Sequence, residues 1–208
     1  LIHSEDYLHQ RGAQVLYAGG IRPLNPFYLG LYGGSELPGI LDSDTSKQAF
    51  FIENRYQEID RVIIQHCDLA GFRPKISRQQ LDVRRRMEVS VTYDPPTPSW
   101  WQALTVGNFE RTRFELRPRG GESVLATATF WSIEPLAISW GAPASGLFQM
   151  DVDPAHRRLG LATYLLGEAL RELSNHGVTL VEAQTMQHNT AALVLYRQVG
   201  NHDLGTEK

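Results

Sequence analysis

The feature that most constrains the fold is an extended apolar segment that passes, without a gap, through a short polar turn into an amphipathic helix. The strand is predicted from four apolar residues, Leu147, Phe148, Met150 and Val152. The helix is predicted from apolar residues at helical spacing, Leu161, Leu165, Ala169, Leu170 and Leu173. Because Pro154 interrupts the pattern between them, we expect the strand to end near Asp153 and the helix to begin within a residue or two of Arg158.

The turn between these two elements has the composition of an anion-binding site. The first N–H groups of a helix have no intrahelical partner, and together with the helix dipole they favour an anion. Gly160 and Ala162 keep side chains away from a phosphate, whereas Arg157 and Arg158 add positive charge beside it. The turn therefore predicts a pyrophosphate site.

Two other interpretations of the turn remain open. Many α/β proteins contain a strand, a turn with Gly and Arg, and a helix that together bind nothing. A dinucleotide-binding turn would need Gly-x-Gly-x-x-Gly and an acidic residue about 20 residues further on. This turn has a single glycine, Gly160, which makes the dinucleotide interpretation the weaker one.

A second motif lies about 30 residues downstream, Asn189-x-x-Ala192-x-x-Leu195-Tyr196-x-x-x-Gly200. Together with Arg157-x-x-Gly160-x-Ala162 it resembles the two signature motifs of the GNAT acetyltransferases, in the order and spacing of that family. The resemblance covers residues 87–208 and departs at Asn201, where the family has Phe.

The resemblance implies a mixed α+β or α/β fold, in which helices flank the mixed sheet of an acyl-CoA N-acyltransferase. It implies an N-acetyltransferase that transfers an acetyl group from acetyl-CoA, its co-substrate, to a primary amine of a small molecule or peptide. Two alternatives stay open: a non-catalytic module that binds or senses acyl-CoA or serves as a scaffold, and a protein-interaction module that uses the basic residues 84–86.

The resemblance also assigns roles to residues. The backbone N–H groups of Met150 and Val152 would meet the pantetheine and the thioester carbonyl, and Asn189 would bind the pantetheine arm. The pyrophosphate would be wrapped by Arg157, Arg158, Leu159, Gly160, Leu161 and Ala162. Tyr196 would protonate the departing thiolate, although an aromatic residue at this helical position can also simply pack on the core.

The general base is not evident from the sequence. The candidates are Glu182, Asp151, Glu134 and His188, and each has an ordinary structural role as its alternative. Trp131 and Trp140 flank the loop of residues 132–139, so we expect them to line the acceptor cleft, although core packing is the simpler role for most aromatic residues.

An internal similarity suggests two related units. Residues 8–18 resemble residues 173–183 at an offset of 165, and residues 50–56 parallel residues 195–201 at an offset of 145. The first pair predicts a helix end, a Gly cap and a buried strand in both places. The similarity therefore predicts two pseudo-repeated GNAT-like units.

Three segments follow from this prediction: residues 1–70 as the second half of an N-terminal copy, residues 71–86 as a connector, and residues 87–208 as the acetyltransferase domain. Phe51 stands where Tyr196 stands in the second unit, so the first copy is expected to be non-catalytic. Its phosphate turn would lie before Leu1, and too few residues follow Gly200 for the two strands with which the family ends.

The hydrophobic patterns predict the remaining strands and helices. Strands are expected at residues 87–93, 111–117, 124–133, 146–153 and 178–183. Helices are expected from Ser77 in the connector, at residues 98–109 and at residues 190–199.

Composition narrows the partners. The net charge of −3 gives no reason to expect nucleic acid or an anionic membrane, and no apolar run is long enough to span a bilayer. The single cysteine, Cys67, fits a reducing cytoplasm and is expected to be a buried hydrophobe rather than a nucleophile. No His and Cys cluster has metal-ligand spacing. A homodimer is compatible with the sequence.

Overall fold

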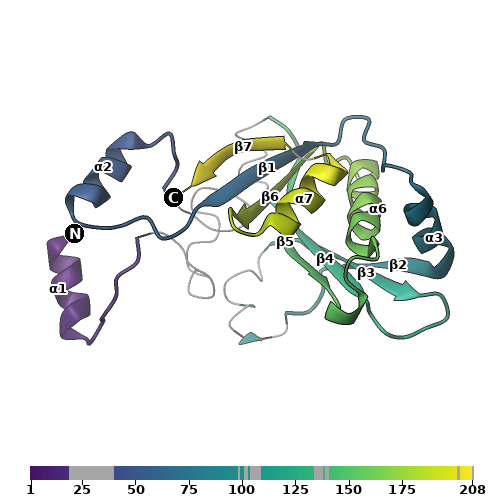
Figure 1. The fold of residues 1–208 in the computed structure, drawn as a ribbon, viewed down its shortest axis with the longest axis horizontal. Coiled ribbons are helices and arrows are strands. Elements are labelled where there is room, and N and C mark those ends of the chain that lie inside the picture. The colour runs from purple at the N-terminus through teal and green to yellow at the C-terminus, as the bar shows by residue number, and fades with distance from the viewer. Residues whose placement is uncertain are drawn as a thin grey trace.

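The structure is a computed structural model of the 208-residue chain. It describes residues 1–18, 40–97, 99–100, 103, 109–133, 138, 141–200 and 202–207, the last range for its backbone only. Figure 1 shows a mixed sheet with helices packed on it, and two further helices at the N-terminal end of the chain.

The helices are α1 (Ile2–Gln10), α2 (Thr45–Glu53), α3 (Arg78–Arg86), α6 (Leu161–Asn175) and α7 (Thr190–Val199), with the short 3-10 helix η2 (Pro154–His156). The strands are β1 (Val62–Asp68), β2 (Met87–Tyr93), β3 (Arg111–Pro118), β4 (Ala126–Ser132), β5 (Ala144–Val152), β6 (Leu180–Met186) and β7 (His202–Glu207). None of the described helices is long and apolar enough to cross a membrane.

The strands form one seven-stranded sheet in the order β2-β3-β4-β5-β6-β1-β7. Every neighbouring pair is antiparallel except β5 and β6, which are parallel. The β5–β6 pairing ends at Leu147↔Ala183, although β5 continues to Val152 and β6 to Met186. The two central strands therefore separate toward their C-terminal ends. The predicted mixed sheet with flanking helices is confirmed.

Strand β1 joins the N-terminal part of the chain to this sheet. It lies between β6 and β7 and pairs antiparallel with both. One strand, β7, follows Gly200, and its neighbour in the sheet comes from residues 62–68 (Figure 1). The division of the chain at residues 70 and 86 remains a prediction, but the last strand of the predicted first unit is built into the sheet of the second.

Helix α6 supplies the centre of the main core. Its predicted apolar stripe is buried at every position, at Leu161, Leu165, Ala169, Leu170 and Leu173. These side chains pack in one cluster with Val181 and Ala183 of β6 and with Tyr196 and Val199 of α7. Helices α6 and α7 therefore cover the same face of the sheet.

A smaller cluster lies on the other face. It contains Trp131, Ile133 and Ala144, with Phe109, Phe148 and Leu180 packed against it. Successive residues of a strand point to opposite faces, and Phe130 belongs to the α6 core whereas Trp131 does not.

Most predicted elements are confirmed. The helix at Thr190–Val199, the helix that begins after Ser77 and the strands from Met87 onward occur within a few residues of the expected positions. The strand predicted after Gly12 is wrong. Residues 13–18 form no strand, and the side chains of Val15 and Tyr17 are 63% and 49% exposed. A strand needs a neighbour for its backbone groups, and no described strand pairs with this segment. The helix predicted at residues 98–109 lies largely outside the described residues.

Candidate functional site

The turn between β5 and α6 has an unusual backbone. Arg158 and Gly160 both adopt left-handed conformations, with φ of 61° and 79°. A side chain at Gly160 would be strained by this φ, and its Cβ would lie 2.8 Å from the side chain of Gln79 on α3. The helix therefore begins after a position that only glycine occupies without strain. It begins at Leu161, three residues after Arg158 and one residue beyond the predicted margin, because Arg158 and Gly160 adopt left-handed conformations before the first helical turn.

The segment before the turn is held by Asp153. Its carboxylate accepts a hydrogen bond from the backbone N–H of Ala155 at 2.9 Å and pairs with Nδ1 of His156 at 2.9 Å. The backbone hydrogen bond and then the His156 contact lower the pKa of Asp153 below its ordinary value. Asp153 thus stays ionised and fixes η2 at the end of β5.

The backbone N–H groups of residues 157–163 point to a ligand site. None of these N–H groups donates a backbone hydrogen bond among those described in turns, loops and caps. The first intrahelical bond of α6 runs from the N–H of Tyr164 to the carbonyl of Gly160 at 3.0 Å. Consecutive donors around left-handed residues form a concave site for an anion, and the helix dipole adds to it. Arg157 lies beside this site, with Nε donating to the carbonyl of Val152 at 3.2 Å.

The edge of β5 that faces β6, beyond the point where the two strands separate, carries further donors. The N–H of Asp153 donates to the carbonyl of Leu125, toward β4, at 2.9 Å. The direction of backbone groups alternates along a strand, so Val152 and Met150 direct their N–H groups to the opposite edge. That edge is where β6 has separated from β5, and it is where the resemblance expects the pantetheine and the thioester carbonyl.

A β-bulge precedes these donors. Leu147 and Gln149 pair with the adjacent residues Phe130 and Thr129, so Phe148 is the additional residue on β5. Bulges bend a strand and increase its twist, and they are common beside binding sites. The bulge coincides with the end of the β5–β6 pairing.

Asn189 and Tyr196 lie on α7. Asn189 is the N-cap, and its side-chain oxygen accepts the N–H of Ala192 at 3.2 Å. Tyr196 is buried in the α6 core cluster, with 7% of its surface exposed. Since the core-packing alternative for Tyr196 also predicts burial, its catalytic role stays a prediction, and so does the binding role of Asn189, which is exposed.

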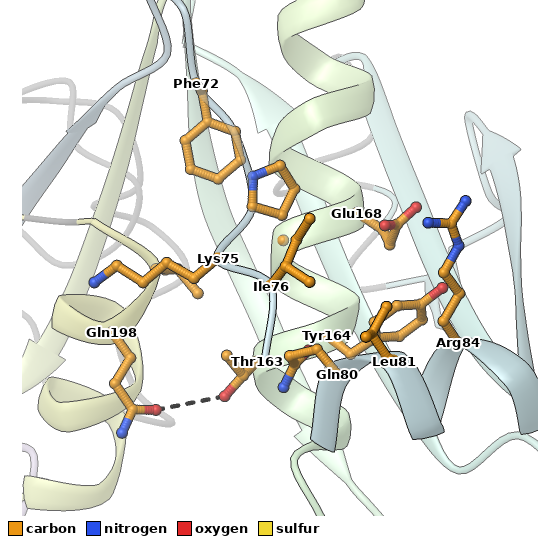
Figure 2. A pocket seen from close by; sticks show the side chains of 13 residues that line it. Phe72, Lys75, Ile76, Gln80, Leu81, Arg84, Thr163, Tyr164, Glu168 and Gln198 are labelled. Atoms are coloured by element: carbon orange, nitrogen blue, oxygen red, sulfur yellow. Dashed lines mark hydrogen bonds between the residues drawn. The ribbon is translucent and has the colours of Figure 1, made fainter. Parts of the chain in front are cut away.

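A pocket lies on the outer side of α6, between the connector, α6 and α7. Figure 2 shows Lys75 and Gln198 on one side of it and Arg84, Tyr164 and Glu168 on the other. Its empty volume is about 530 Å³, which includes open solvent. The pocket mixes apolar walls with two cationic side chains.

Two hydrogen bonds connect this pocket to its surroundings. Thr163 donates to Gln198 at 3.5 Å and joins α6 to α7 (Figure 2). The Nε2 of Gln80 donates to the carbonyl of Gly160 at 3.4 Å, so the N-terminus of α3 contacts the turn itself. The sequence interpretation placed no residue of α3 at the site, because nothing in the local pattern indicates which helix packs there.

The candidate bases lie in different places. Glu182 is buried on β6 and contacts His66, whereas Asp151 is an exposed partner of Gln149 and His188 is an exposed partner of Asp60. Glu134 and the cleft candidate Trp140 lie outside the described residues. His66 was not predicted, since its contact with Glu182 depends on the pairing of distant strands.

Two further predicted residues are placed clearly. Trp131 is 2% exposed and packs on Phe109 and Phe148, with ring centroids 4.9 and 5.4 Å away. Cys67 is buried, and burial raises the pKa of its thiol to about 11, which favours the unreactive interpretation. Among the described residues, no group of three or more His, Cys, Asp and Glu side chains could hold a metal ion.

Comparison with known proteins assigns the chain to a family. The model of the acetyltransferase (GNAT) family matches residues 83–200, more than half of the chain. The chain belongs to the GNAT family of acetyltransferases, whose chemistry is acyl transfer. A comparison with curated proteins finds no match.

Solved structures agree on the fold. A tandem GNAT protein from the clavulanic acid biosynthesis pathway matches with a TM-score of 0.56 at 12% identity, over 81% of this chain and 60% of that one. A GCN5-related N-acetyltransferase from Sphaerobacter thermophilus matches with a TM-score of 0.54 at 16% identity, over 81% of this chain and 56% of that one. The chain thus spans somewhat more than half the length of these two proteins.

Proposed function

We propose that this protein is an N-acetyltransferase that transfers an acetyl group from acetyl-CoA to a primary amine of a small molecule or peptide. The observation that carries the proposal is the row of backbone N–H donors at residues 157–163, beside an open strand edge with two more donors, Met150 and Val152. A pyrophosphate joined to a thioester by an extended arm has this pattern of acceptors.

Each element then has a task in the reaction. The turn of residues 157–162 binds the pyrophosphate, and the side chains of Arg157 and Arg158 add charge. Met150 and Val152 hold the pantetheine and polarise the thioester carbonyl through their N–H groups. Asn189 binds the pantetheine arm, and Tyr196 protonates the thiolate as the carbon–sulfur bond breaks. The buried single cysteine, Cys67, fits a reducing cytoplasm as the location.

The proposal extends to the organisation of the chain. Residues 1–70 are the second half of a first GNAT-like copy, residues 71–86 are the connector, and residues 87–208 are the catalytic copy. Helix ends that match at the offsets of 165 and 145 support this arrangement, and so does the likeness in fold to a tandem GNAT protein. Because Phe51 replaces the tyrosine, the first copy lacks a proton donor.

The test measures thiol release from acetyl-CoA with a panel of amines: glucosamine, spermidine, benzylamine and a lysine-containing peptide. We expect one class to be acetylated. Arg157→Glu should weaken CoA binding by about 1–3 kcal/mol in calorimetry, the order of charge-assisted hydrogen bonds. Arg85→Glu is the matched control, because the side chain of Arg85 is 79% exposed and lies on the connector helix.

Two outcomes would contradict this proposal. Tight CoA binding without thiol release from any amine would make the protein a binding or sensing module. Unchanged affinity in Arg157→Glu would mean that the pyrophosphate lies elsewhere.

A further inference from the structure

A row of aligned strand positions crosses the sheet on the face opposite α6. The strand register aligns Arg111 on β3, Trp131 on β4, Gly146 on β5, Glu182 on β6, His66 on β1 and His202 on β7. Residues directly opposite one another in a sheet share a face. Val181 and Ala183 pack under α6, so Glu182 between them points to the other face.

This face is the one that α6 and α7 leave uncovered, so an acceptor for the proposed transfer would approach from it. Helices α6 and α7 fill the other face with a continuous core. The donors of Met150 and Val152 lie at the strand edge where β5 and β6 separate. The pairing of β5 and β6 ends one residue beyond Glu182, so its position lies beside that opening.

Glu182 is a buried carboxylate with a defined orientation. The residue is 3% exposed, one oxygen contacts Nε2 of His66 at 2.9 Å, and the other accepts Nε2 of Gln184 at 2.9 Å. A buried carboxylate is costly unless it is hydrogen-bonded, and an apolar residue would stabilise the same site at no such cost. The side chain of His66 is 16% exposed against 4% for Glu182, so the pair runs from the interior toward solvent.

Trp131 places a second buried polar group on the same row. Its indole Nε1 is buried and has no hydrogen-bond partner among the described residues. Buried donors in native structures are nearly always paired, and none of the described residues provides the partner of this one. Gly146 lies between Trp131 and Glu182 in the row and places no side chain there.

We propose that Glu182 is the general base for the acceptor amine and that His66 passes the proton from Glu182 to solvent. This inference rests on the proposed acetyl transfer. The acceptor ammonium loses one proton as its N–H bond breaks and an O–H bond forms on Glu182. The nitrogen lone pair then attacks the thioester carbonyl carbon, and the carbon–sulfur bond breaks.

The protons balance without a further reactant. An ammonium and a thioester become an amide, a thiol and one free proton. The free proton leaves Glu182 by way of His66. The nitrogen loses a second proton as the amide forms. The thiolate takes a proton from the hydroxyl of Tyr196, and the second amine proton then restores that hydroxyl. Glu182 is thus the catalytic residue, and His66 acts through it as a positioning residue.

A purely structural role predicts something different. The His66–Glu182 contact joins β1 to β6, so in a purely structural role it would do no more than anchor the N-terminal segment to the sheet. The contact between Asp60 and His188, at 3.2 Å, joins the same two segments at an exposed position. Asp60→Asn is therefore the matched control for a lost anchor.

The experiment uses the full chain, acetyl-CoA and whichever amine of the panel above reacts fastest. The rate is followed from about pH 6 to about pH 10, near the pKa of an alkyl ammonium at about 10.4. The described titratable and charged groups on this face near Glu182 are His66, Asp68 and Arg111, with the His202 position beyond His66. Binding of CoA is measured in parallel.

We expect Glu182→Gln to lower kcat/KM by about 10²- to 10⁴-fold at neutral pH while the affinity for CoA is unchanged. The loss should shrink as pH rises, because the acceptor then arrives already deprotonated. His66→Gln should show the same trend with a smaller loss, and Asp60→Asn should match the wild-type protein.

Two results would overturn the relay. A wild-type rate in Glu182→Gln, or a loss equal at every pH, refutes the base while acetyl transfer stands. Should Glu182→Gln fail to fold by circular dichroism, His66→Gln decides by the same criterion. Failure of the wild-type protein to release thiol with any amine refutes the proposed function, and the relay with it.

Discussion

Helices α1 and α6 end with the same hydrogen bonds, but they differ in how deeply they are buried. In α1, the N–H of Gly12 donates to His9 and that of Ala13 donates to Leu8, at 2.9 and 3.0 Å. In α6, the equivalent bonds run from Gly177 to Ser174 and from Val178 to Leu173, at 3.0 and 3.1 Å. The two glycines have φ of 92° and 88°. Every partner is related by the offset of 165 residues.

Helices α2 and α7 repeat this pattern at the offset of 145. Asp44 and Asn189 are the N-caps, and each accepts the N–H three residues later. A left-handed residue follows each helix: Arg55, one residue after the C-cap Asn54 of α2, has a φ of 66°, and Gly200, the C-cap of α7, has a φ of 112°. Their N–H groups donate to the carbonyls of Ile52 and Arg197.

The two N-terminal helices, α1 and α2, differ from their counterparts α6 and α7 in burial. Helices α1 and α2 contain no buried residue, whereas α6 has a buried face along its length. Short-range hydrogen bonds therefore set where a helix starts and stops, independently of what it packs against. Stability comes from the packing of a helix face, and of these four helices only α6 and α7 have buried residues.

The largest expected effect compares two equivalent leucines. Leu173 is 7% exposed and Leu8 is 43% exposed. Leu173→Ala should lower the free energy of unfolding by about 2–5 kcal/mol, and Leu8→Ala should change it by less than about 0.5 kcal/mol. Chemical denaturation measures both. Equal losses would show that α1 is buried in solution as α6 is.

The next comparison concerns Tyr196 and Phe51. Tyr196→Phe removes one hydroxyl and leaves the ring packed, so folding and CoA affinity should stay near wild type. Turnover should fall by about 10²-fold, or about 2.7 kcal/mol in activation free energy. The reverse change, Phe51→Tyr, should leave turnover unaltered. If Tyr196→Phe acetylates at the wild-type rate with chemistry rate-limiting, Tyr196 is a packing residue.

A smaller effect is expected at the left-handed residues that follow α2 and α7, Arg55 and Gly200. Gly200→Ala should lower the free energy of unfolding by about 1–2 kcal/mol, since L-residues disfavour this conformation. The added Cβ would meet Sγ of Cys67 at 3.8 Å, an ordinary contact, so the cost lies in the backbone. Arg55→Gly relieves the same strain in α2, and hydrogen exchange at its N–H should become slower. A tolerated Gly200→Ala in thermal unfolding would contradict this account.

The smallest effect is a pH dependence confined to α2. The side-chain hydrogen bond with Lys47, then the backbone N–H of Lys47, lower the pKa of Asp44 from 3.8 to about 2. Because the folded pKa is depressed, the cap is fully present above 3.8 and is lost as pH falls through about 2. The amide chemical shift of Lys47 should report this midpoint, whereas that of Ala192, capped by the neutral Asn189, should not titrate. A midpoint near 3.8 would mean that the α2 cap does not form in solution.

The sequence alone determined the local parts of the site. The apolar stripe of α6, the bounds of α7 and the glycine at the turn follow from residues close together in the chain, through helical spacing and unpaired N–H groups. The same short-range signals predicted the helix end before Gly12. The strand predicted at residues 13–18 is wrong, because this segment has no described neighbour to pair with.

Only the tertiary structure decided how distant segments meet. The sequence shows an apolar run at Val62–Asp68 but nothing that places it between β6 and β7. A shift of one residue in that register would turn every side chain of β1 to the other face of the sheet. The contact between His66 and Glu182, 116 residues apart in the chain, therefore exists because long-range strand pairing selected one register, which no local pattern specifies.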